Sequence, residues 1–239
     1  MIFSYTYKVR ASDCGLTTNM ELVGAFNCVE DICSEYLAAL GMTGIYLSKT
    51  YGVTWVYTKH KMQIFKPLPW LSPYTVKCFL SKMSKVTTVV DFAFYDESGD
   101  LAIYSQLEMC LIDLNTSRIS ALSAVGFDKL EVHKSILPGS FSRFAVTNAT
   151  QKDRVVVKNS NIDCNNHTNN TEYIRLLLDS YPMEHLRTRR IKSIEVNYIN
   201  QSRLGEELVI SVAAEDNCHK VVFTRGDTQI IKCEIFFDN

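Results

Sequence analysis

The sequence predicts an α+β fold in which one unit occurs twice, and each unit is a long helix followed by a curled antiparallel sheet. The first observation is a repeated motif, because DCGLTTN at residues 13–19 matches DCNNHTN at residues 163–169 in Asp, Cys, Thr and Asn. The others are that a helix-like stretch follows each motif, and that long β-branched and aromatic segments follow each helix. A chain of 239 residues that is 46% hydrophobic can bury the core that such a fold needs.

The first helix is expected directly after the first motif. Thr18 and Glu21 have the spacing of a capping box, and Gly41 is typical of a helix end. Apolar residues recur between these positions at helical intervals. They are Leu22, Phe26, Val29, Cys33, Leu37 and Leu40.

The second helix is expected after the second motif, where Asn169 and Glu172 have the capping spacing, and Pro182 limits its length. The two helices are therefore counterparts. The apolar face of the second consists of Tyr173, Ile174, Leu177, Leu178 and Tyr181.

Strand candidates surround each helix, and turns such as Gly226-Asp227 join several of them. Consecutive strands with short connections pair antiparallel, so each sheet can wrap its apolar face around a helix. Residues 114–152 have few strongly periodic segments, and we expect them to connect an N-terminal domain, 1–130, to a C-terminal domain, 131–239. The expected strands are 3–10, 51–66, 73–83, 86–96 and 101–112 in the first unit and 153–158, 191–201, 206–214, 218–225 and 228–237 in the second.

Composition and charge argue against several classes of function. A formal net charge of −1 removes the case for a nucleic-acid binder that depends on bulk positive charge. The eight cysteines form no CxxC pair, which favours free thiols in a reducing compartment. The first residues, MIFSYTYKVR, lack a signal-peptide pattern, and no stretch approaches the roughly 18 apolar residues of a membrane span. We therefore expect a cytoplasmic protein.

The second motif carries the residues that we expect to do chemistry. In an extended segment, Asp163, Asn165 and His167 stand at alternate positions and project to the same side. The helix that follows leaves backbone N–H groups unpaired at its start, and its dipole favours negative charge there, so this end is a natural oxyanion site. The candidate oxyanion residues are Thr168, Asn169 and Asn170.

A family resemblance rests chiefly on the run Asp163-x-Asn165-x-His167-x-Asn169-Asn170-x-x-Tyr173. This run, at the second of two sheet-wrapped helices, resembles the catalytic run of the double hotdog acyl-ACP thioesterases of plants and bacteria. Residues 52–56 look like the Trp-containing strand entry of the first hotdog, and residues 196–208 look like the first strand pair of the second. The resemblance covers most of the chain and implies two hotdog domains in tandem.

The resemblance implies hydrolysis of the thioester of fatty acyl-ACP, which releases free fatty acid and holo-ACP in fatty acid biosynthesis, with no metal or other cofactor. Such hydrolysis needs activation of the attacking group, a donor for the oxyanion and a proton for the departing thiol. We expect Asp163 to activate or orient the attacking group, Asn165 to hold the carboxylate or water, and His167 to orient the substrate and manage the proton. Whether Asp163 instead attacks the carbonyl carbon covalently stays open.

The chain also departs from the family pattern. Where the family commonly has a catalytic Glu followed by Cys on a second-domain strand, an ungapped match places Gln201 and Ser202. A glutamine can orient water or donate a hydrogen bond but cannot act as a base, so Gln201 joins the candidate catalytic set with a different role. In the first copy, Gly15 and Thr17 stand in for the Asn and the His of the second motif. We therefore expect no active site in the first copy.

Simpler interpretations of the motif stand beside the catalytic one. A run rich in Asn and Asp ahead of a helix is commonly a loop with a good cap. Cys164 and His167 have C-x-x-H spacing, but a metal site needs further ligands. A Cys164–His167 nucleophile pair is conceivable, yet Cys14 persists in the copy without the His, and alternation directs Cys164 away from Asp163. The strand aromatics can line an acyl tunnel or simply form core. They are Trp55, Phe65, Phe92, Phe94 and Tyr104.

A basic run, HLRTRRIK at residues 185–192, follows the second helix. Such a run is usually a solvated face. Acyl carrier proteins are acidic, however, so positive charge near the entrance would speed encounter and orient docking of the acyl-phosphopantetheine arm. The candidate docking residues are Arg187, Arg189, Arg190 and Lys192.

Two rival functions stay open at this stage. An acyl-CoA thioesterase would use the same pantetheine thioester, and a non-catalytic acyl-thioester-binding hotdog protein would use the same fold. A hotdog dehydratase would not explain the Asn-rich run, and an acyl-sensing regulator would need a DNA-binding helix-turn-helix. Acyl chain length and oligomeric state are also open, because the duplication already supplies the pairing that single hotdogs obtain by dimerising, and a homodimer is compatible with it.

Overall fold

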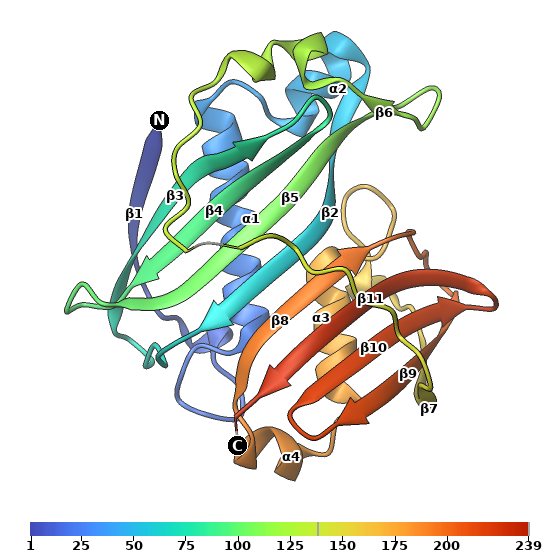
Figure 1. Ribbon diagram of the computed structural model, residues 1–239. Helices are drawn as coiled ribbons and strands as arrows, with labels where there is room; N and C mark the ends of the chain where they lie inside the picture. The colour runs from blue at the N-terminus through green and yellow to red at the C-terminus, as the bar shows by residue number, and fades with distance from the viewer. Residues whose placement is uncertain (138, 239) are drawn as a thin grey trace.

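The computed structural model describes residues 1–137 and 139–238, and within them it shows one antiparallel sheet of 11 strands (Figure 1). The strands follow one another in the order β1-β3-β4-β5-β2-β8-β11-β10-β9-β7, and β6 pairs with β5 at the side. The strand bounds are β1 Ile2–Lys8, β2 Val53–Ile64, β3 Pro73–Met83, β4 Thr87–Tyr95, β5 Leu101–Asp113, β6 Ile119–Ser120, β7 Thr150–Val156, β8 Ile191–Tyr198, β9 Glu207–Glu215, β10 Cys218–Arg225 and β11 Thr228–Phe237.

The first half of the sheet curves around the long helix α1, Leu22–Ala39, as the sequence predicts. Phe26 and Val29 on this helix are fully buried. The helix ends in a Schellman motif, because Met42 N donates to Leu37 O at 2.8 Å and Gly41 has a φ of 70°. The prediction that Gly41 ends the helix is confirmed. A short helix that the sequence did not predict, α2 Gly44–Tyr51, leads into β2.

The predicted capping box at the start of α1 is wrong. Glu21 itself is the N-cap residue, and it makes no side-chain cap hydrogen bond. Its carboxylate turns back and accepts a hydrogen bond from the backbone N–H of Leu16. The Thr18 side chain therefore has no place in the cap, because Thr18 lies in the loop before it.

The second half repeats this arrangement around α3, Asn170–Asp179. Asn169 caps the helix as predicted, since its side chain accepts from Thr171 N at 2.8 Å. Tyr173 and Ile174 on this helix are buried against the sheet. A short helix, α4 Met183–Thr188, follows Pro182.

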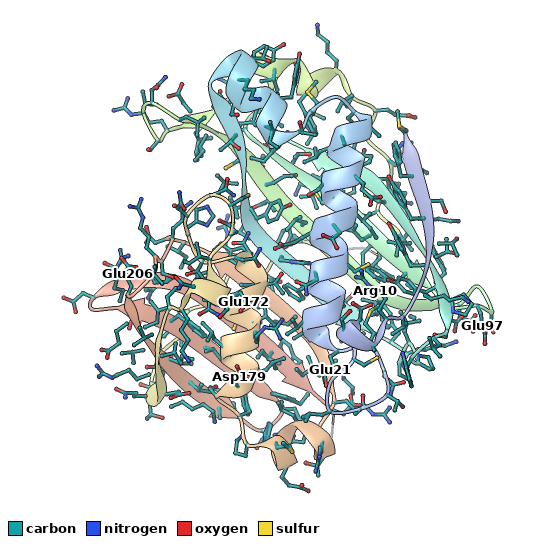
Figure 2. All side chains as sticks on the ribbon, turned by 180° about the vertical axis from the view of Figure 1, so that it is seen from behind. Arg10, Glu21, Glu97, Glu172, Asp179 and Glu206 are labelled. Carbon is teal, nitrogen blue, oxygen red and sulfur yellow. The ribbon has the colours of Figure 1, made fainter. Side chains whose placement is uncertain are left out.

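The two halves form one continuous sheet through β2 and β8. Lys61 of β2 lies opposite Glu195 of β8, and their Nζ and Oε2 atoms are 3.6 Å apart. Both α1 and α3 lie on the same face of this sheet, side by side. Figure 2 shows them running in opposite directions, with Glu21 at the start of α1 near Asp179 at the end of α3. Each helix start is therefore close to the other helix.

The connection between the halves crosses the opposite face of the sheet (Figure 1). It carries two 3-10 turns, η2 Leu122–Val125 and η3 Phe127–Lys129, and residues 130–137 and 139–149 then lead to β7 without regular structure. Ser135 donates to the buried Asp91 of β4 at 2.5 Å, and Ser142 N donates to Glu195 of β8 at 2.7 Å. The connection thus binds to both halves of the sheet. None of the helices in residues 1–137 and 139–238 has the length and apolar character needed to cross a membrane.

Candidate active site

The loop before α3 is a closed turn and not the extended segment that the sequence predicts. Ile162 and Thr168 form an isolated antiparallel bridge, and Asp163 N donates to His167 O at 3.0 Å. Within this closure Asn166 N donates to Asp163 O at 3.1 Å, and Asn166 has a φ of 62°. An Asn at this position is favoured because Asn tolerates the left-handed region better than most residues. The alternation argument for this loop is therefore wrong.

The turn nevertheless brings the three predicted side chains together. Asp163 Oδ1 accepts from Asn165 N at 2.8 Å, and its Oδ2 accepts from Asn165 Nδ2 at 3.3 Å. His167 Nδ1 lies 3.6 Å from Asp163 Oδ2 and 3.4 Å from Thr168 O. Both contacts use Nδ1, which leaves Nε2 available for a proton transfer to another group. The arrangement is a carboxylate, an amide and an imidazole within contact distance.

This group is only partly buried. The side chains of Asp163 and His167 are each 21% exposed, and Asn165 is exposed. The three groups therefore meet beside a helix start that is open to solvent, not one enclosed in the core. Solvent reaches all three, as a hydrolytic site requires for its water.

The predicted oxyanion residues have different environments. Thr168 N already donates to Ser202 O at 2.8 Å, and Asn169 N donates to Asn161 O at 2.9 Å. Neither N–H group is free to bind an oxyanion, which contradicts the prediction for these two residues. Asn170 N, the first of α3, has no hydrogen-bond partner in the described part of the chain. It is the one member of the predicted set that still has a free backbone donor at the helix start.

Gln201 lies in the loop after β8, and not on a strand as the sequence suggested. Its side chain is exposed, and its backbone oxygen accepts from Arg225 at 3.4 Å. The neighbouring Ser202 is fully buried, and its Oγ contacts Thr168 Oγ1 at 2.7 Å and Tyr173 OH at 2.8 Å. Ser202 therefore joins the Gln201 loop to both the loop at residues 162–168 and α3.

The structural repeat is shifted by two positions from the motif alignment. Asp13 and Asn161 are true counterparts, because Asp13 O accepts from the N-cap residue Glu21, and Asn161 O accepts from the N-cap residue Asn169, each at 2.9 Å. The same register pairs the bridge Cys14–Met20 with the bridge Ile162–Thr168. In this register Asp163 corresponds to Gly15, Asn165 to Thr17 and His167 to Asn19. The motif alignment of Asp13 with Asp163 is therefore wrong.

The first loop consequently lacks the aspartate as well as the histidine. At Gly15 an added Cβ would collide with the Glu21 carboxylate, which occupies the space of the missing side chain. Gly15 and Asn19 thus stand at the positions that Asp163 and His167 occupy in the second loop, and the absence of an active site from the first copy stays a prediction.

A groove of about 830 Å³ lies between this first loop and the end of α3. Its lining includes Glu21 and Pro67 from the first half and Arg175, Leu178 and Leu186 from the second. Asp163, Asn165 and His167 do not line it. The groove therefore lies at the first loop, at the opposite end of α3 from the three polar side chains.

The four predicted docking residues all line this groove, but they differ in their contacts. Arg189 Nη2 donates to Asp216 O at 2.8 Å and to Asn217 Oδ1 at 2.5 Å, and Lys192 pairs with Asp238 at 3.3 Å. In the part of the chain that the structure describes, the side chains of Arg187 and Arg190 make neither a hydrogen bond nor an ion pair. Their exposed guanidinium groups are the free cations of the run.

Five of the cysteines, Cys28, Cys33, Cys78, Cys110 and Cys233, are buried and act as packing residues. All eight are free, and Cys164 is exposed on the turn. Burial raises the pKa of the Cys28 and Cys33 thiols to about 12, so both are uncharged at neutral pH. Among the described residues, no group of three or more His, Cys, Asp or Glu side chains is arranged to hold a metal ion.

Comparison with known sequences shows the family. The acyl-ACP thioesterase N-terminal domain matches residues 1–124, and the acyl-ACP thioesterase C-terminal domain matches residues 145–236. The chain belongs to the acyl-ACP thioesterase family. It is 20% identical over 230 residues to the chloroplastic acyl-[acyl-carrier-protein] hydrolase FATB1 of Cuphea viscosissima, covering 90% of this chain and 55% of that protein. The chain thus spans about half the length of this curated relative.

Solved structures confirm the tandem hotdog fold. The acyl-ACP thioesterase of Bacteroides thetaiotaomicron superposes with a TM-score of 0.92 at 21% identity, over 99% of this chain and 98% of the other. The 12:0-ACP thioesterase of Umbellularia californica superposes with a TM-score of 0.86 at 14% identity, over 99% and 97% of the two chains. At these identities the likeness establishes the fold.

Sequence reasoning missed one polar group beside the site, Glu30 of α1. Its Oε2 accepts from Asn169 Nδ2 at 3.3 Å, across the boundary between the two halves. A signal was present, because Glu30 lies one turn after Phe26 and one turn before Cys33, two residues of the apolar helix face. A glutamate there is unusual for a face that packs in the core.

Proposed function

We propose that the chain hydrolyses the thioester of fatty acyl-ACP and releases free fatty acid and holo-ACP. The observation that carries this proposal is the contact of Asp163 with both Asn165 and His167 beside the start of α3. Family membership supports the same reaction, and the names of the curated relatives describe it for those proteins. The reaction needs no cofactor, since water supplies the attacking oxygen.

Each group has a role in the proposed mechanism. Asp163 accepts a proton from water as the water oxygen bonds to the acyl carbon, and Asn165 holds the carboxylate in place. Asn170 N–H faces the growing charge on the thioester oxygen from the helix start. His167 gives its proton to sulfur as the carbon–sulfur bond breaks, and Asp163 then returns the proton it took to His167. Gln201 orients the water and takes no proton.

The proposal includes docking of the carrier protein at the basic run. Arg187 and Arg190 provide free positive charge for an acidic carrier, but they follow the far end of α3. The ten residues of α3 span about 15 Å, so the pantetheine arm would have to run along this helix to reach Asp163. An acyl-CoA substrate would not need this surface.

The proposal also includes the expected domain division, the expected compartment and a homodimer. A division at residues 130 and 131 is supported by the family matches, which leave residues 125–144 between them. A reducing compartment such as the cytoplasm is supported by the eight free cysteines. A homodimer is compatible with the fold, in which the duplication already supplies one internal pairing.

The test is hydrolysis of acyl-ACP by the purified protein, with Asp163→Asn purified in parallel. We expect release of free fatty acid by the natural sequence and a loss of about 10²- to 10⁴-fold in the variant, because the variant cannot accept a proton. Circular dichroism should show the same fold for both. An acyl-CoA series in the same assay separates the two carriers.

Equal turnover by Asp163→Asn would remove this residue from the mechanism. Binding of acyl-ACP without hydrolysis by either protein would favour the non-catalytic acyl-binding alternative, for which the glutamine at position 201 is the motivating observation. Profiling the fatty acids released in cells that overproduce the protein would give the chain-length preference.

A further inference from the structure

Glu30 connects α1 of the first half to the start of α3 in the second. Its Oε2 accepts from Asn169 Nδ2 at 3.3 Å, and Asn169 Oδ1 in turn accepts from Thr171 N at 2.8 Å. Asn169 is the N-cap residue of α3 and lies two residues after His167. The Glu30 carboxylate is thus linked through one side chain to the helix start that carries Asn170 N–H.

The other oxygen of this carboxylate has no partner. Glu30 Oε1 is buried without a hydrogen bond in the described part of the chain, and the same is true of Thr171 Oγ1 and Tyr198 OH. Burial first, and then the charge of Glu30, raises the pKa of Tyr198. A buried carboxylate oxygen without a partner is costly, so a purely structural role would favour a different residue here.

The internal repeat gives a direct comparison for this position. Glu30 is the ninth residue after the N-cap residue of α1, and Leu178 is the ninth after that of α3. Leu178 lines the groove beside the first loop, the loop without Asp and His. The fold therefore accepts leucine at this helix position where no catalytic set is present, and it carries glutamate where the set is complete.

The repeat also identifies the residue of the first half that corresponds to Gln201. Leu68 O accepts from Met20 N, and Ser202 O accepts from Thr168 N, each at 2.8 Å, so Pro67 and Gln201 are counterparts. Pro67 lines the groove, which places Gln201 at the corresponding edge of the second loop. Across the junction from that edge, α1 supplies the carboxylate that position 201 lacks.

The charged and titratable groups around Glu30 come from four elements. Asp31 lies beside it on α1, and the charge of Asp163, in the loop before α3, also acts on it. The charge of Glu30 also acts on Cys33 of α1, Tyr57 of β2 and Tyr198 of β8. Burial, with the negative charges of Asp163 and Asp31 as smaller causes, raises the pKa of Glu30 to about 7, against the hydrogen bond from Asn169 that lowers it. Glu30 therefore changes charge near neutral pH.

We propose that Glu30 is a positioning residue of the catalytic site, supplied by the first half to the second. As a carboxylate it holds Asn169 by a charge-assisted hydrogen bond, and it provides the second acidic group that Gln201 cannot provide. This hold fixes the start of α3 relative to Asp163 and His167, where a displacement of about 1 Å can cost about 10²-fold in rate. The inference rests on the proposed thioester hydrolysis.

The proposal predicts that removing the charge of Glu30 lowers the rate of hydrolysis and raises the stability of the fold. Removing the charge in Glu30→Gln keeps an acceptor for Asn169 but weakens the hold, so kcat at pH 8 should fall about tenfold or more with little change in KM. Because the folded-state pKa is raised, ionisation of Glu30 lowers stability as pH rises from about 4.5 to about 7. Glu30→Gln should therefore raise Tm at pH 8.

The experiment measures kcat, KM and Tm from pH 5.5 to 9 for the natural sequence and Glu30→Gln, with Asp31→Asn as the matched control that removes an exposed charge one residue away. Glu30→Leu copies Leu178 and should lose at least as much activity. We expect kcat of the natural sequence to fall as pH drops through about 7, and this limb to be absent in Glu30→Gln.

Two results would overturn the proposal. One is a Glu30→Gln variant with unchanged kcat and pH profile while Asp163→Asn is inactive. The other is a fall of Tm in Glu30→Gln at pH 8 together with a rate that keeps its pH limb, which is the signature of a structural residue. Absence of hydrolysis by the natural sequence would instead overturn the proposed function, and this inference with it.

Discussion

Arg189 shows how the contacts of a single residue decide its role. The sequence places it in a run of four cations, but its guanidinium donates to Asp216 O and Asn217 Oδ1 and lies 5.1 Å from the centre of the Phe237 ring. Lys192 is likewise paired with Asp238. Arg189 and Lys192 thus make their polar contacts within this chain. Arg187 and Arg190 are the pair on which a docking test depends.

We expect the double variant Arg187→Glu, Arg190→Glu to raise KM for acyl-ACP several-fold, because reversing free rim charges weakens encounter with an acidic carrier. KM for a short acyl-thioester mimic should be unchanged. Arg189→Ala is the comparison variant and should lower Tm instead. Steady-state kinetics at two salt concentrations check the prediction, and equal changes for both substrates would count against docking at this surface.

At the scale of elements, the strands and helices follow from side-chain patterns that the sequence displays. The predicted strands 73–83, 218–225 and 228–237 have the bounds that the structure shows. Burial on one face repeats along strands and helices with a fixed period, so a single sequence is enough to locate them. The short helix α2, Gly44–Tyr51, was missed because eight residues give little periodic signal.

The loops were harder to predict, for a physical reason. The segment from Asp163 to His167 is closed by backbone hydrogen bonds and by the positive φ of Asn166, and neither leaves a periodic pattern. The same holds for the register of the repeat, which is set by the bonds from Glu21 to Asp13 and from Asn169 to Asn161. The four identical residues of the motif therefore predicted the register of the repeat less well than these backbone hydrogen bonds define it.

The start of α1 provides a test at the element scale. A Cβ on Gly24 would lie 2.5 Å from Asp13 O and 2.8 Å from Asp13 Cα, both in the backbone of the preceding turn. Gly24→Ala gains about 1 kcal/mol of helix propensity, yet we expect a net loss of about 1–2 kcal/mol, because helix and turn must move apart. Urea unfolding measures it. Asn27→Ala, on the exposed side of the same helix, should be neutral or stabilising.

On the scale of the whole molecule, the two halves depend on a buried seam. His60 of β2 is 1% exposed, lies opposite Val196 of β8, and contacts Ser105 of β5 at 2.7 Å. Burial lowers the pKa of His60 to about 3. An uncharged histidine therefore sits where the first half meets the second.

We expect acid to destabilise the whole fold through this residue. As pH falls from about 6.5 to about 3, the unfolded chain binds a proton at His60 that the folded chain does not bind, so stability is lost over that range. His60→Gln keeps a hydrogen-bonding group for Ser105 and should reduce the loss by about 1–4 kcal/mol. Urea unfolding at pH 4 and pH 7 checks this, with His133→Gln as the control. An unchanged difference between the two pH values would contradict it.

The loop that begins with Asp13 has a consequence for how this chain can change. It keeps the bridge, the turn length and the helix start of the loop before α3, while Gly15 and Asn19 stand where that loop has Asp163 and His167. The first loop therefore has the backbone of the second loop, and it lines an open groove. Substitution of a few side chains in the first loop would allow new chemistry there, and the loop before α3 would stay unchanged.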